Sequence, residues 1–203
     1  MKKLPILLIY FRLVIGLLLL PLAYFAVSNF AAIAIIIIAA GLISDIFDGI
    51  IARKYHVSTE KLRRLDSSID QVFWISVIGA LYIHCPAFFQ AHKTSIFVLM
   101  GAEAATYLVS YARFGKEIAT HAISSKLWTL SLFATIIQIA ATCQSGILFQ
   151  VCFYVGMLTR LENIAILLLL KEWTNDVPSA YHAFQLRRGK EIKRNKLFNG
   201  KND

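Results

Sequence analysis

Hydrophobic residues occur along this chain in long blocks separated by short polar segments. Each block approaches the roughly 20 residues that an α-helix needs to cross about 30 Å of hydrocarbon. Because a backbone inside lipid must satisfy its own hydrogen bonds, such blocks are expected to be helices. The pattern therefore predicts an all-α integral membrane protein with six transmembrane helices, over residues 5–27, 30–53, 65–83, 95–112, 127–141 and 146–170.

The polar connectors carry charge unequally. Six spans place both termini on one side of the membrane, together with connectors 53–64 and 113–126, and this side holds nearly all the Lys and Arg. The other side receives three short segments, 28–29, 84–94 and 142–145, which we expect to be loops. Since Lys and Arg favour the cytoplasmic side, both termini and the basic connectors are expected to face the cytoplasm from the cytoplasmic (inner) membrane.

Composition supports a membrane protein and argues against a nucleic-acid partner. The chain has 203 residues, of which 58% are hydrophobic, and a formal net charge of +9. Its basic residues lie between membrane-length apolar runs, so we expect no nucleic-acid binding. We predict a membrane domain over residues 1–174 and a basic cytoplasmic tail over 175–203. The tail is expected either to carry an interfacial helix that binds anionic membrane lipids or to be a solvated end.

Four aspartates stand out because they occur in two helical pairs. Asp45 and Asp48 are spaced i, i+3 near the end of the second block, and Asp66 and Asp70 are spaced i, i+4 at the start of the third. Each pair lies on one face of a helix. Two such helices facing each other would gather four carboxylates, which repel one another unless a cation intervenes. Oxygen ligands of this kind suit Mg²⁺ or Mn²⁺, and one such ion or two would relieve the repulsion.

The same stretch resembles the signature of the CDP-alcohol phosphotransferase family, D-x2-D-G-x2-A-R-x8-G-x3-D-x3-D. The spacing is kept from Asp45 to Asp70, and Leu62 replaces the second glycine. The family often also opens with Pro-Asn-x-x-Thr-x-x-Arg, of which Pro5 and Arg12 remain here while Ile6 and Ile9 replace the polar positions. The matching positions of the main signature are Asp45, Asp48, Gly49, Ala52, Arg53, Asp66 and Asp70.

The resemblance implies a metal-dependent enzyme of phospholipid synthesis. It would transfer a phosphatidyl group from CDP-diacylglycerol to an alcohol and release CMP. Carried over to this sequence, Asp45, Asp48 and Asp66 are metal ligands. Asp70 is the catalytic base and a further ligand or near-ligand. Contacts to the nucleotide of the donor are expected from Gly49, Arg53 and Thr59. The resemblance also implies a homodimer.

The acceptor site is less clearly marked. In many relatives, basic residues near the fourth and fifth spans recruit a phosphate of the acceptor. Arg113, Lys116 and Lys126 fall in that region, although they could equally be cytoplasmic anchors of the spans. Three cations at the cytoplasmic mouth fit a phosphorylated alcohol better than a neutral one. We take glycerol 3-phosphate as the expected acceptor, and inositol phosphate, serine and other alcohols stay open.

Two other functions remain open at this point. Leu62 could narrow the nucleotide pocket, and the chain would then be a divergent relative that binds a CDP-linked lipid without turnover. Alternatively, Asp45, Asp48 and Arg160 could line the polar path of a small transporter. Against this path, the four aspartates cluster at one membrane face. Arg160 is otherwise expected to form a structural ion pair with Glu103 or Glu162.

The three cysteines show no metal-ligand spacing. We interpret Cys85, Cys143 and Cys152 as apolar fillers or free thiols, and do not expect a bridge between the first two.

Overall fold

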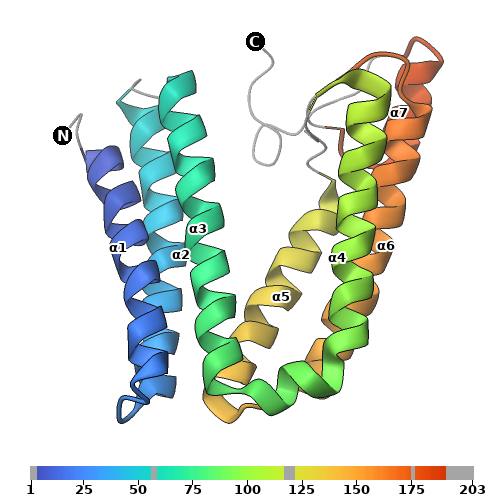
Figure 1. Ribbon diagram of the computed structural model, residues 1–203. Coiled ribbons are helices and arrows are strands. Elements are labelled where there is room, and N and C mark those ends of the chain that lie inside the picture. Colours follow the sequence, from blue (N-terminus) through green and yellow to red (C-terminus); the bar gives the residue numbers. More distant parts are fainter. Residues whose placement is uncertain (1–3, 56–58, 117–121, 175–176, 191–203) are drawn as a thin grey trace. The chain divides into compact units, whose positions relative to one another are not determined.

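The computed structural model describes residues 4–55, 59–116, 122–174 and 177–190. Over these ranges the chain forms seven helices and no strand (Figure 1). Five of them are long and apolar enough to cross a membrane, and α3 carries a shorter apolar stretch over Ser68–His84. The chain is thus an all-helical, multi-pass membrane protein. The helices are α1 (Leu4–Tyr24), α2 (Phe30–Lys54), α3 (Glu60–His84), α4 (Pro86–Phe114), α5 (Ile123–Thr142), α6 (Ile147–Leu169) and α7 (Ala180–Arg187).

Three helices, α3, α4 and α5, begin earlier than the apolar blocks suggest. α3 starts at Glu60, because the Thr59 side chain caps it by accepting a hydrogen bond from the backbone N–H of Leu62 at 3.2 Å. The predicted loop over 84–94 is wrong, since α4 begins at Pro86 and continues through that segment. Proline suits the first position of a helix, where its missing N–H leaves no hydrogen bond unmade.

The chain divides into two compact units. The first comprises residues 1–91 and 136–145, and in it α1 packs against α2 and α3. The buried residues of α1 recur every three or four positions and form one narrow stripe along the helix. That stripe consists of Pro5, Ile9, Arg12, Gly16, Leu19 and Ala23.

A disulfide joins two helix ends of the first unit. Cys85, which follows α3, is bonded to Cys143, which follows α5. The prediction that these residues are apolar fillers or free thiols is therefore wrong. Cys152 is a free, buried thiol, as expected. Sequence spacing could not reveal the pairing, because it depends on two helices that end at the same place.

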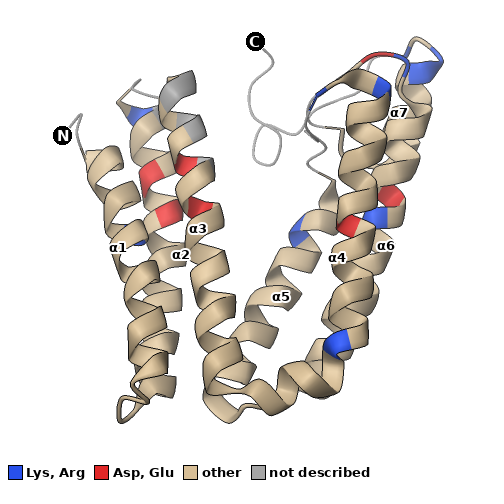
Figure 2. Cartoon of the chain, in the orientation of Figure 1, with Lys and Arg blue, Asp and Glu red and all other residues tan. Residues whose placement is uncertain are grey.

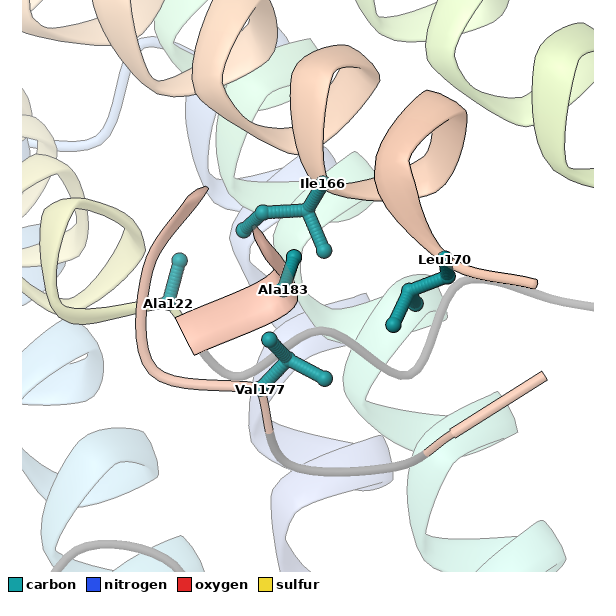
Figure 3. Close-up of a cluster of buried hydrophobic side chains, with 5 residues drawn as sticks. All are labelled: Ala122, Ile166, Leu170, Val177 and Ala183. Atoms are coloured by element: carbon teal, nitrogen blue, oxygen red, sulfur yellow. The ribbon is translucent and has the colours of Figure 1, made fainter. Parts of the chain in front are cut away.

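The second unit comprises residues 92–135 and 146–203. In it α7 packs against α6, and a cluster of five buried residues joins these helices to the start of α5 (Figure 3). Glu162 of α6 accepts a hydrogen bond from the backbone N–H of Ala180, the first residue of α7, at 3.3 Å. The part of the tail that the structure describes thus includes a docked helix. The cluster consists of Ala122, Ile166, Leu170, Val177 and Ala183.

Arg160 forms the expected ion pair inside the second unit. Its Nε atom lies 2.6 Å from a carboxylate oxygen of Glu103, and its guanidinium carbon lies 3.6 Å from the ring centroid of Trp128. Arg160 is buried, so the carboxylate and the aromatic face replace the water that this charge would otherwise keep.

Candidate metal centre and active site

The predicted pairs of aspartates meet at one level of the three-helix bundle. α2 presents Asp45 and Asp48, and α3 presents Asp66 and Asp70 (Figure 2). Asp45, Asp48 and Asp66 each offer a carboxylate oxygen, and these three oxygens lie within 4.8 Å of one another. The i, i+3 and i, i+4 spacings therefore do what the sequence predicts: they turn both pairs toward a shared centre.

An arginine lies among the four carboxylates. The guanidinium of Arg12, from α1, donates hydrogen bonds to Asp45 and Asp66. It also lies 3.6 Å from an oxygen of Asp48 and 3.9 Å from an oxygen of Asp70. The sequence predicts Arg12 only as the remainder of an opening motif. The available signal was its position as a lone charge in an apolar block, because such a charge needs a partner at membrane depth.

The cluster is closed on one side and open on the other. The side chains of Arg12 and Asp48 are 0% and 4% exposed, whereas that of Asp45 is 41% exposed. Asp66 and Asp70 are also partly exposed. A small ligand can thus approach the three open carboxylates, while Asp48 and Arg12 form the inner wall.

These carboxylates fit a divalent cation. One Arg12 guanidinium offsets a single negative charge, so three remain when all four aspartates are ionised. Among the residues that the structure describes, Oδ2 of the buried Asp48 has no hydrogen-bond partner. Buried polar atoms normally have one. Carboxylate oxygens are the ligands that Mg²⁺ and Mn²⁺ prefer, so both the donor set and the residual charge suit such an ion.

Close helix packing supports the layer directly beneath the carboxylates. Phe73 lies one turn beyond Asp70 on α3, is 1% exposed, and sits between Gly16 of α1 and Gly41 of α2. A Cβ atom on either glycine would come within 2.7 Å of the Phe73 ring, closer than real Cβ atoms approach. The two glycines therefore let α1, α2 and α3 approach closely enough to share one site.

Comparison with known proteins identifies the family. The model of the CDP-alcohol phosphatidyltransferase family matches residues 2–170, most of the chain. The chain belongs to this family. No curated protein and no solved structure matches it. Members carry out phosphatidyl transfer in phospholipid synthesis, with CDP-alcohol substrates and an acceptor alcohol, and generally depend on a divalent metal.

The residues predicted to bind the donor lie near the carboxylates in sequence and have different local roles. Gly49 follows Asp48 on α2 and is partly buried. Thr59 caps α3, and Leu62 lies in the first turn of that helix, partly buried. The side chain of Arg53 lies outside what the structure describes. These assignments therefore remain predictions.

The three residues predicted to bind the acceptor belong to the second unit. Arg113 donates a hydrogen bond of 2.9 Å to the carbonyl of Leu170, the residue that follows α6 and caps its end. The Lys116 ammonium lies 4.7 Å from the ring centroid of Trp173. Lys126 is partly buried on α5. Arg113 and Lys116 thus stabilise the end of α6 and the segment after it, and their binding of an acceptor remains a prediction.

Proposed function

We propose that the protein transfers a phosphatidyl group from CDP-diacylglycerol to an alcohol and releases CMP, in a reaction that needs Mg²⁺ or Mn²⁺. The observation that carries this proposal is the convergence of four aspartates from α2 and α3, three of them open to a ligand. Membership of the family supplies the reaction class. The transporter alternative loses support, because the aspartates form one compact cluster around Arg12 and not a path along the bundle.

Asp45, Asp48 and Asp66 would hold the metal, with Asp70 as a further ligand or near-ligand. Two divalent ions bound there would neutralise the negative charge of the pyrophosphate and of the departing CMP. The partial exposure of Asp45 and Asp66 leaves room for phosphate oxygens beside the ligands. The buried Asp48 fixes the inner side of the site, because it cannot turn toward solvent without leaving the packed bundle.

Asp70 is proposed as the general base. It is partly exposed, at the margin of the carboxylate cluster, where an alcohol can approach. Its carboxylate takes the hydroxyl proton while the alcohol oxygen forms a bond to the phosphorus that carries diacylglycerol. The bond from this phosphorus to the bridging oxygen of the pyrophosphate breaks, and CMP leaves with the bonding electron pair.

Gly49, Arg53 and Thr59 are proposed to contact the nucleotide of the donor. A glycine next to Asp48 lets a ligand approach the backbone of α2 closely. The guanidinium of Arg53 suits a phosphate. The Thr59 hydroxyl accepts the capping hydrogen bond from Leu62, and its own proton remains to be donated to a ligand.

Glycerol 3-phosphate is the proposed acceptor. Arg113, Lys116 and Lys126 would supply positive charge for its phosphate. The contacts of Arg113 with Leu170 and of Lys116 with Trp173 hold these cations at defined places in the second unit, which suits a preformed anion site. The active protein is proposed to be a homodimer embedded in membrane lipids.

The site is proposed to face the cytoplasm, in a membrane crossed six times. α3 serves as the sixth span, because its 25 residues extend over about 37 Å. Asp66 and Asp70 lie near the beginning of this helix, and the Cys85–Cys143 disulfide follows its end. Disulfides persist in oxidising compartments and are rare in the cytosol. The disulfide thus favours the orientation that the Lys and Arg distribution predicts.

The test is CMP release by the purified protein in liposomes with CDP-diacylglycerol, Mg²⁺ or Mn²⁺, and a panel of alcohols. We expect release that depends on glycerol 3-phosphate, stops when the metal is chelated, and falls by about 10²–10⁴-fold in Asp70→Asn, the usual contribution of a general base. Asp70→Asn should keep most metal binding. An unaltered rate in this variant would exclude Asp70 as the base.

A relative without turnover gives a different result in the same experiment. Leu62 is the feature that favours this second function, because it replaces a family glycine. Folded protein that binds Mn²⁺ and the CDP-linked lipid but releases no CMP with any alcohol would support it. Metal-dependent flux across the liposome membrane without CMP would instead support a transporter.

A further inference from the structure

Arg12 occupies the centre that the proposed metal ions would need. It is 0% exposed and belongs to the apolar inner stripe of α1, between Ile9 and Gly16. An arginine at such a depth is costly unless carboxylates or other polar groups compensate its charge. Here the compensation comes from all four aspartates of the cluster, two of them through hydrogen bonds.

The guanidinium and a metal ion would compete for the same oxygens. Arg12 donates to one carboxylate oxygen each of Asp45 and Asp66, and these two residues are among the three whose oxygens lie within 4.8 Å of one another. A metal ion binds such oxygens at about 2.0–2.1 Å for Mg²⁺. A guanidinium between them leaves no room for that approach, and two cations so close would also repel each other.

Little else holds the guanidinium in place. The hydrogen bonds that the structure describes for it go to the aspartates, and Nε has no hydrogen-bond partner among the described residues. Arginine is a long side chain with many rotamers, so its head group can move while α1 stays packed. If the guanidinium leaves, its contacts with the carboxylates are lost, and a metal ion replaces them. No other polar contact that the structure describes is lost.

We propose that Arg12 is an internal counter-cation, which holds the four carboxylates together in the metal-free protein and is displaced from between them when divalent metal binds. The inference rests on the proposed metal site. Its consequence is a weaker apparent metal affinity, because the ion binds only the fraction of molecules in which Arg12 has left the carboxylates. The counter-cation lowers affinity and, in return, stabilises the bundle while no metal is bound.

The test measures Mn²⁺ binding and thermal stability in the full-length protein in detergent. Free Mn²⁺ is followed by electron paramagnetic resonance for the wild type and for Arg12→Met, which keeps an unbranched stem as long as that of arginine up to Nε and removes the charged head group. We expect Arg12→Met to bind Mn²⁺ at least about tenfold more tightly, equivalent to about 1.4 kcal/mol. Without metal it should unfold at a lower temperature than the wild type, and Mn²⁺ should restore more of its stability.

Arg160→Met is the matched control. It removes an arginine of similar burial that pairs with a single carboxylate, Glu103, in the other unit. It should lower stability without changing Mn²⁺ affinity. If Arg12→Met does not fold, Arg12→Lys decides the question, because a lysine ammonium keeps the charge but cannot bridge carboxylates as a guanidinium does. Arg12→Lys should then bind Mn²⁺ more tightly than the wild type.

The outcomes separate this inference from the proposed function. If the wild type binds Mn²⁺ and Arg12→Met binds it equally or more weakly, Arg12 does not compete with the metal, and the metal site stays intact. The same holds for Arg12→Lys where that variant decides. Tighter binding in Arg160→Met as well as in Arg12→Met would also overturn it, because the effect would then be general. Absence of Mn²⁺ binding in the wild type and in every folded variant would overturn the metal site itself.

Discussion

Replacement of Gly41 by alanine tests whether the packing beneath the carboxylates holds the site in place. An ideal Cβ atom there would lie 2.2 Å from Cζ of Phe73 and 2.7 and 2.8 Å from its two Cε atoms. Carbon atoms in contact are normally about 3.5 Å apart or more, so the ring would have to move by more than about 1 Å. Little space is free on its other side, where a Cβ on Gly16 would stand 2.7 Å from Cδ2 of the same ring.

The expected cost follows from overpacking a buried site, which is typically about 1–3 kcal/mol. For a chain of this size, that lowers Tm by about 2–4 °C per kcal/mol. The rate of CMP release should fall more than a loss of folded protein would explain, because Gly41 lies one turn from Asp45 and Phe73 one turn from Asp70. A misplacement of about 1 Å can cost about 10²-fold in rate, and we expect CMP release to fall at least about tenfold.

The loss of stability in Gly41→Ala is measured by unfolding the purified protein in detergent micelles with heat or sodium dodecyl sulfate. Gly101→Ala is the control: a Cβ at this glycine of α4 meets no atom within 4 Å, so stability should stay the same or rise by up to about 1 kcal/mol, the helix-propensity gain of alanine over glycine. The double variant Gly41→Ala/Phe73→Leu should be more stable than the two single changes predict together, by at least about 0.5 kcal/mol. If Gly41→Ala is as stable as the wild type and the double variant shows no coupling energy with Phe73, the two residues do not pack as described.

Three further changes test other parts of the chain. Leu62→Gly should lower KM for the CDP-linked donor if the leucine narrows the nucleotide pocket, and an unchanged KM would show that it does not. Replacing Cys85 and Cys143 together by serine should cost about 2–4 kcal/mol in unfolding experiments, because the disulfide closes a separation of 58 residues, and a reducing agent should destabilise only the wild type. Ala183→Leu should destabilise the packing of α7 by about 1–3 kcal/mol, since Ala183 is fully buried against α6, and should speed proteolysis of the tail. Cleavage as slow as in the wild type would contradict this. Tyr181→Phe, at an exposed position, is the control and should leave the cleavage rate unchanged.

The aspartate cluster was predictable because it depends on local residue spacing. The spacing of Asp45 and Asp48, and of Asp66 and Asp70, fixes the helix face of each pair, and mutual repulsion then requires a shared cation. That Arg12 lies among these carboxylates in the metal-free protein was not predictable in this way. It depends on which helix packs against α2 and α3, and that choice is made by the fit of Phe73 between Gly16 and Gly41.

Hydrophobic blocks predicted the helices well and their ends less well. A block shows where lipid covers a helix, whereas a helix continues as long as its backbone hydrogen bonds and caps permit. Thr59 and Pro86 therefore extend α3 and α4 into segments that appear to be connectors by composition alone. The Cys85–Cys143 bridge escaped prediction for a related reason, because only the assembled bundle brings those two helix ends together.

The position of Arg12 also bears on how the protein enters the membrane. Ribosomes deliver α1 first, with one buried positive charge whose cost at the centre of an inserting helix is about 2.5–3.5 kcal/mol. α2 then brings Asp45 and Asp48, and α3 brings Asp66 and Asp70, so the charge of this inner group changes from +1 to −1 to −3 as the helices arrive in order. The first helix thus gains its counter-charge only when the second is in place, so the cost of burying Arg12 falls once the α1–α2 hairpin has formed.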